Sequence, residues 1–183
     1  MLICGFRFNI IFLIGLGASL VGLCSCQSPE SKQRKLQSTL RVHLENPYDR
    51  TERTQKVPIG RAEPVMINID KMPFVTEENV KQAKVVETVG GFMISIQLDK
   101  HGTMMLEQYS SASHGKRFAI FSQFVMDPGG KTNFLRWLGA PKISARIGDG
   151  ILNFTPDADR EEALNIVLGL NNVARKVQKA ITW

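Results

Sequence analysis

The stretch that most constrains the fold spans residues 89–124, because it predicts a strand, a helix and a second strand in immediate succession. Large apolar side chains recur at every second position from Phe92 to Leu98, the period of a strand with one face in a core. Residues 118–124 are apolar on both faces, as in a central strand. We therefore expect Ile96 and Ile120 to be fully buried.

A helix is expected between these two strands. Asp99 stands where an N-cap residue belongs, and Met105, Tyr109 and Ala112 follow at helical spacing. Gly115 is placed to end the helix in the left-handed conformation that glycine adopts readily.

Alternation predicts further strands before this unit. A half-buried strand is expected at 40–45, with His43 on its polar face, followed by an edge strand at 51–59 and a third strand at 65–69. Thr76 is typical of a short helix start, with Val80 and Ala83 as the apolar side of that helix.

After the unit, residues 125–140 form the least regular part of the sequence. A hairpin is then expected, in which 143–147 pairs with 151–154 through a turn at Asp149 and Gly150. The last helix begins at a cap, Asp157 or Asp159. Its apolar stripe comprises Ala163, Val167, Leu170, Ala174 and Val177, widened by Leu164 and Leu168.

These elements predict an α+β fold. The expected architecture is a mainly antiparallel sheet with two longer helices and one short helix packed on it.

Cysteine usage and charge exclude several function classes. All three cysteines lie within the first 26 residues, so the rest of the chain holds no disulfide framework, thiolate cluster or catalytic cysteine. The formal net charge of +6 comes from scattered basic residues, which argues against nucleic acid as a partner.

The N-terminal segment predicts export and lipidation. An apolar run at 10–23 has the size of a signal-peptide core and is too short to span a bilayer comfortably. It ends in Leu23-Cys24-Ser25-Cys26, which resembles the bacterial lipobox, and this resemblance implies that Cys26 is the acylated first residue of the mature chain. Gln27, where the family's inner-membrane retention signal has Asp, favours the outer membrane. A plain signal peptide and an uncleaved anchor helix remain the alternatives.

The chain is accordingly divided into three parts. Residues 1–25 are expected to be a lipoprotein signal peptide, 26–38 a lipidated cysteine and flexible tether, and 39–183 one folded domain in the periplasm.

Several short motifs of the domain resemble the first periplasmic head domain of SecD and SecDF, the export-associated membrane proteins. The resemblance covers about 74–173, in the order Phe74 to Val80, Ala83 to Val85, Ile94 to Asp99 with Gly102, Gly115 to Ile120, Ala140-Pro141 with Ile143, Ile147, Gly150, Phe154-Thr155 and Glu161 to Ala163. It implies the head's fold and contact with exported polypeptide. It does not imply a motor, because nothing after Cys26 corresponds to the family's membrane-embedded half, and 124–139 looks like an insertion.

Candidate chemistry is sparse. The histidines His43, His101 and His114 lack a second ligand at metal-binding spacing, so no metal site is expected and surface positions are favoured. The acidic residues Asp157, Asp159, Glu161 and Glu162 have the spacing that helix capping alone predicts. We expect no catalytic residue and no cofactor.

Phe134, Leu135, Trp137 and Leu138 are the candidate partner-binding residues. They form either a buried satellite cluster or an exposed apolar patch that holds an extended polypeptide, since aromatic anchors dominate such contacts.

The sequence therefore favours a non-enzymatic, lipid-anchored periplasmic protein that binds polypeptide or a partner in export. A structural scaffold of an envelope complex is the alternative, and an envelope hydrolase is a third class with no residue constellation behind it.

Overall fold

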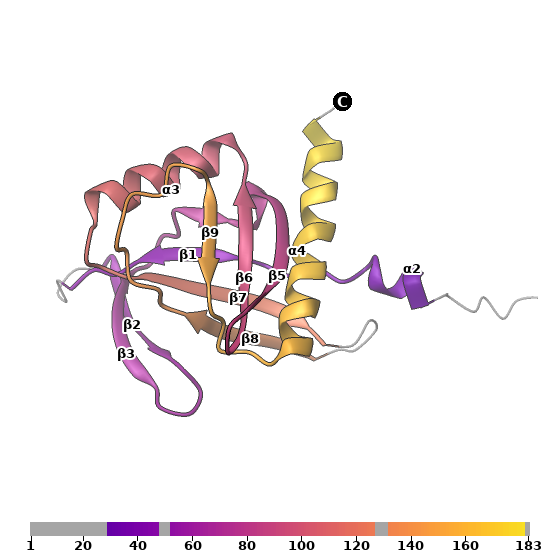
Figure 1. Ribbon diagram of the computed structural model, residues 1–183, viewed down its shortest axis with the longest axis horizontal. Helices are drawn as coiled ribbons and strands as arrows, with labels where there is room; N and C mark the ends of the chain where they lie inside the picture. The colour runs from indigo at the N-terminus through magenta and orange to yellow at the C-terminus, as the bar shows by residue number, and fades with distance from the viewer. Residues whose placement is uncertain (1–28, 48–51, 127–131, 182–183) are drawn as a thin grey trace, which may run out of the picture.

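The computed structural model describes residues 29–47, 52–126 and 132–181. Figure 1 shows strands crossing in layers, with α3 over one end and α4 along one side. The helices are α2 (Pro29–Gln33), the 3-10 turn η1 (Glu77–Asn79), α3 (Lys100–Ala112) and α4 (Arg160–Ile181). The strands are β1 (Arg41–Leu44), β2 (Thr54–Ile59), β3 (Val65–Asp70), β4 (Val75–Thr76), β5 (Val80–Thr88), β6 (Gly91–Leu98), β7 (Phe118–Val125), β8 (Asn133–Gly139) and β9 (Ile151–Phe154).

The strands form three sheets, with orders β4-β1-β7-β8, β2-β3 and β5-β6-β9. Neighbouring strands in the described part of the chain are antiparallel. The α+β class and the two longer helices are confirmed, although the predicted single sheet is divided into three.

The predicted strand-helix-strand unit is confirmed as β6, α3 and β7. The Asp99 carboxylate accepts a hydrogen bond from the Gly102 backbone N–H at 2.7 Å, so it caps α3 as expected. Gly115 has a φ of 84°, which few other residues adopt without strain. Ile96 and Ile120 are both 0% exposed.

Most of the apolar side chains lie in one core between the sheets and the two long helices. β1, β6 and β7 supply its centre, α3 contributes Leu106, and α4 contributes Ala163, Ile166 and Leu170. α4 was predicted with Leu164 inside its stripe, but Leu164 is exposed and Ile166 is buried instead. Its cap is reciprocal, because the Asp159 carboxylate accepts from Glu162 N and the Glu162 carboxylate accepts from Asp159 N.

A second core lies on the opposite face of the β1-β7-β8 sheet. There the β2-β3 hairpin buries Val57, Ile59, Ile67 and Ile69 against Ala119, with Trp137 packed beside them. The sheet is therefore covered on both faces. The prediction that His43 is a surface residue is wrong for this reason: it is 4% exposed beneath the hairpin.

Three local predictions are also wrong. The short helix is only the turn η1, and Val80 and Ala83 belong to β5. Residues 143–147 form no strand, because the backbone of Ile143 pairs with 115–116 and the Ser110 hydroxyl oxygen accepts from Ile147 N; β9 pairs with β6 instead. Residues 125–140, predicted to be the least regular part of the sequence, contain the strand β8.

The folded part begins earlier than residue 39. Leu36 and Ser38 are buried, and the Asn172 amide of α4 donates to the carbonyl oxygens of Gln33 and Leu36 at 2.9 and 3.0 Å. A Cβ at Gly169 would collide with Ser38, so this glycine permits the close approach. The second half of the predicted tether is therefore packed on α4. The signal peptide and Cys26 lie outside the described residues.

Candidate functional site

The four predicted binding residues lie on β8, and the alternation of the strand separates them into two pairs. Leu138 is 0% exposed in the main core, and Phe134 stacks on Phe124 with ring centroids 5.7 Å apart. Leu135 and Trp137 point to the opposite face. Leu135 is 65% exposed, whereas Trp137 is partly buried.

Trp137 is held by aromatic contacts on the hairpin side of the sheet. Its ring centroid lies 5.1 Å from that of Phe121 and 5.4 Å from that of His43, the latter edge-on. Such pairs add to the stabilisation from burial alone. Trp137 therefore links the hairpin to the sheet, and Leu135 is the residue of the four that is free to meet a partner.

A hollow of about 240 Å³ lies beside these side chains. The residues that line it are Pro58, Gly60, Arg61, Phe121, Leu135, Arg136, Trp137 and Asp157, and we call them the β8 surface. The volume is below the roughly 300–1,000 Å³ of typical small-molecule pockets, so the hollow fits a side chain better than a ligand of drug size.

The charges of the β8 surface are paired. Arg61 Nε lies 3.1 Å from Asp157 Oδ1, and Arg136 Nη1 lies 2.7 Å from Glu162 Oε2. Burial acts to raise the pKa of the Glu162 carboxyl, but hydrogen bonds from Arg136 and Asp159 N and the charge of Arg61 lower it below its usual value. Glu162 is thus held ionised, which suits a structural ion pair and not a general acid.

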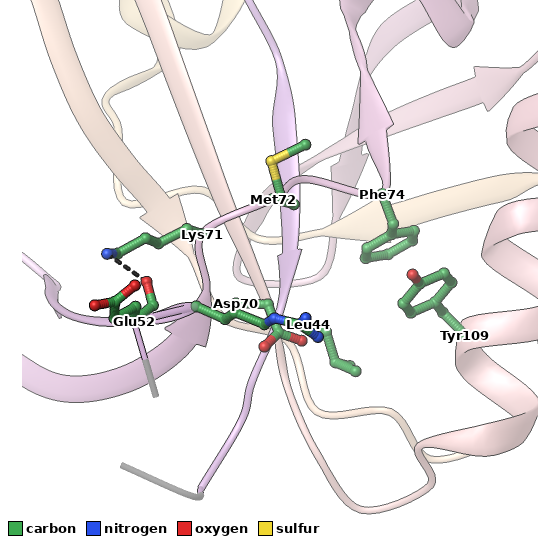
Figure 2. Close-up of a pocket in the computed structure, with 8 residues that line it drawn as sticks. Leu44, Glu52, Asp70, Lys71, Met72, Phe74 and Tyr109 are labelled. Atoms are coloured by element: carbon green, nitrogen blue, oxygen red, sulfur yellow. Dashed lines mark hydrogen bonds between the residues drawn. The ribbon is translucent and has the colours of Figure 1, made fainter. Parts of the chain in front are cut away.

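A second hollow, of about 550 Å³, lies where β1, the hairpin and α3 meet, and Figure 2 shows its lining. Phe74 and Tyr109 stack there with centroids 4.3 Å apart, and Lys71 Nζ donates to the Glu52 carbonyl oxygen at 2.6 Å. The described lining combines apolar and charged groups, and among these residues no nucleophile stands beside a base.

The remaining candidate groups are dispersed and have ordinary partners. His43 Nδ1 donates to the Asp70 carbonyl oxygen, His114 Nε2 contacts the Ser144 carbonyl oxygen, and His101 contacts the Asn79 amide. Within residues 29–47, 52–126 and 132–181, no three His, Cys, Asp or Glu side chains gather as a metal site would require. None of the helices in these ranges is long and apolar enough to cross a membrane.

Of the residues that line this hollow, the sequence singles out Leu135 and Trp137 and not their neighbours. Phe121 was visible only as one apolar residue of a central strand. Pro58, Arg61 and Asp157 carry no sequence signal of this surface, because they come from segments far apart in the chain. The bond from Arg61 N to the Asp157 carboxylate, for example, joins residues 96 positions apart.

Comparison of the sequence with family models and with curated proteins finds no match. Among solved structures, the chain resembles one from a study of "a membrane component SecDF that enhances protein export", with a TM-score of 0.52 and 17% identity over 84% of this chain and 71% of that one. A second structure, of SecDF in a "Super-membrane-facing form", gives 0.52 and 17% over 80% of this chain and 21% of that one.

The protein therefore has an α+β fold of the SecDF head type, as the resemblance in the sequence implied. The match covers more than the 74–173 segment that carried the resemblance.

Proposed function

We propose that this protein is a non-enzymatic, lipid-anchored component of the bacterial cell envelope that binds extended polypeptide during protein export. The fold supports an export role, because the similar SecDF structure is described as a component that enhances protein export. The lipobox-like Leu23 to Cys26 supports the anchor and a periplasmic location.

One observation carries the binding role: Leu135 is exposed at a hollow lined by Trp137 and Phe121, next to charges that already have partners. Exposed apolar side chains beside a preformed hollow are typical of contact sites for other polypeptides.

The test is a binding titration with the full acylated chain in detergent micelles. A fluorescently labelled exported protein, held unfolded, is expected to bind saturably, whereas the same protein in its folded form is not. Leu135→Glu should weaken binding by about tenfold or more, equivalent to about 1.4 kcal/mol.

Met104→Glu is the matched control. Met104 is 60% exposed, close to the 65% of Leu135, but it lies on α3 and does not line the β8 surface. Its substitution should leave the affinity unchanged. Equal affinity of the wild type and Leu135→Glu would contradict the proposed site.

A scaffold role is the second candidate, and the β2-β3 hairpin favours it. The loop end of the hairpin extends beyond the sheet that the hairpin covers (Figure 1), and Val65 and Met66 next to it are exposed. If the protein is a scaffold, one stable partner should copurify with it. Met66→Glu should then release that partner, and Leu135→Glu should not.

A further inference from the structure

Among the strands that the structure describes, β8 is an edge of the four-stranded sheet, since β7 is its one neighbour in the order β4-β1-β7-β8. An edge strand exposes backbone N–H and C=O groups that can pair with another extended chain. Whether β8 can pair with another chain therefore depends on which of its residues direct these backbone groups away from β7.

The contacts of β7 fix the direction. Gln123 O accepts from Thr39 N, and Gln123 N donates to the Thr39 hydroxyl oxygen, so both backbone groups of Gln123 point away from β8. Gln123 stands opposite Leu135 in the antiparallel register. In such a ladder, paired residues alternate between bonding each other and pointing away. Leu135 therefore directs its N–H and C=O to the open side, and so do Asn133 and Trp137.

The other edges of the described sheets carry protective devices. On β5, the Asn171 side chain accepts from Ala83 N at 2.8 Å and donates to Ala83 O at 2.9 Å. β2 carries Pro58, which has no N–H, and β4 and β9 are only 2 and 4 residues long. β3, the other edge of the two-stranded sheet, is met by residues 45–46, where Asn46 N donates to Asn68 O at 2.9 Å. Proline and short length are recognised means of blunting an edge.

β8 is protected only at its end. Asp157 N donates to Leu138 O at 2.6 Å, next to the bulge opposite Ile120 and Phe121. Within the described residues, no hydrogen bond reaches the outward backbone groups of Leu135 and Trp137. The five residues 133–137 are thus an open edge of about 17 Å.

We propose that this open edge binds an extended polypeptide by β-strand addition, an inference that rests on the proposed function and gives it a binding mode. Hydrogen bonds between backbones do not select a particular sequence in the added strand. The hollow beside Leu135 takes an apolar side chain of the added strand, and the paired charges of Arg61 and Arg136 impose no strong preference for a charged one. The occupant is therefore an extended, uncharged segment with alternating apolar side chains.

The first test compares two substitutions at one position in the full chain. Leu135→Ala removes the side chain but keeps the outward N–H, whereas Leu135→Pro also removes the N–H. Because this N–H does not pair with β7, proline there leaves the β7-β8 ladder intact. The probe is a short blocked peptide of alternating leucine and serine. Leu135→Pro should bind it about tenfold more weakly than Leu135→Ala, and equal affinities would overturn the inference.

The second test needs no substitution. Amide hydrogen exchange at Leu135 and Trp137 should be fast in the free protein and slow by about tenfold or more on adding the peptide, while exchange at Arg136, which faces β7, stays slow throughout. Binding without this protection would overturn strand addition and leave the proposed function standing. If, without peptide, exchange at Leu135 and Trp137 becomes slower as the protein concentration rises, the edge pairs with a second copy of the chain, and this would overturn the inference. An absence of any polypeptide binding would overturn both proposals.

Discussion

At the scale of single residues, His43 is a buried group whose protonation makes stability depend on pH. Its burial beneath the hairpin lowers its pKa below the ordinary value of 6.5, and the hydrogen bond to Asp70 O opposes this only in part. The unfolded chain therefore takes up a proton at a higher pH than the folded one. As pH falls below about 6.5, the unfolded state gains that proton first, so the free energy of unfolding should fall until the lower pKa of the folded state is passed.

Urea unfolding at a series of pH values measures this effect. His43→Gln should flatten the curve in the window below pH 6.5. Glu162, whose pKa is lowered from 4.5, contributes stability that is lost as pH falls below about 4.5, so its loss begins at a more acidic pH than that of His43. An unchanged slope in His43→Gln would contradict the assignment to this ring.

Trp137 and Leu135 stand two positions apart and should respond differently to truncation. Trp137→Ala removes the ring that contacts Phe121 and His43, so it should lower the free energy of unfolding by about 2–3 kcal/mol, somewhat less than for a fully buried aromatic residue. Leu135→Ala should change it by less than about 0.5 kcal/mol. Denaturant titrations of both variants decide the matter, and equal losses would mean that Leu135 is also a packing residue.

At the scale of elements, Asn171 joins α4 to the edge of β5. Asn171→Ala leaves both backbone groups of Ala83 without these side-chain partners, which should cost about 1–3 kcal/mol. Exchange of the Ala83 amide should become faster. Leu164→Ala, an exposed change in the same helix, is the control and should alter neither quantity.

Elements fixed by local chemistry were predictable, and those fixed by distant partners were not. The cap at Asp99, the alternation of β6 and the apolar stripe of α4 each depend on residues that are close together in the sequence. The alternation of Ile143, Ala145 and Ile147 predicted a hairpin that does not form, because β9 pairs with the distant strand β6 and not with the residues just before it.

The candidate site divides in the same way. The apolar residues of β8 were identifiable from composition, because they interrupt a regular pattern. Their separation into an inner and an outer pair depends on two layers that cover the sheet, and the hairpin that forms one of them lies more than 60 residues earlier in the chain. The open edge depends on strand order, which local periodicity does not determine.

At the scale of the whole molecule, the packing of Gln33 and Leu36 on α4 limits the distance between the domain and an anchor at Cys26. The seven steps from residue 26 to 33 span at most about 25 Å, whereas a tether to residue 38 would span about 40 Å. If Cys26 is acylated, the domain therefore stays close to the membrane surface.

Cys26→Ser tests the anchor. The variant should accumulate with its leader attached, or as a soluble species, and should carry no acyl chains, because the thiol that receives the lipid is missing. Mass spectrometry of the mature N-terminus gives the result. An unmodified first residue other than Cys26 in the wild type would contradict the anchor.

Site-specific photo-crosslinking in the native cell tests the central claim most directly. A photoreactive amino acid is placed at Leu135 in one strain and at the similarly exposed Met104 in another, with the N-terminal segment intact. We predict that position 135 crosslinks to a range of exported polypeptides while they are being translocated, and that position 104 does not. Crosslinks to one folded partner alone, or equal crosslinking from both positions, would contradict the account.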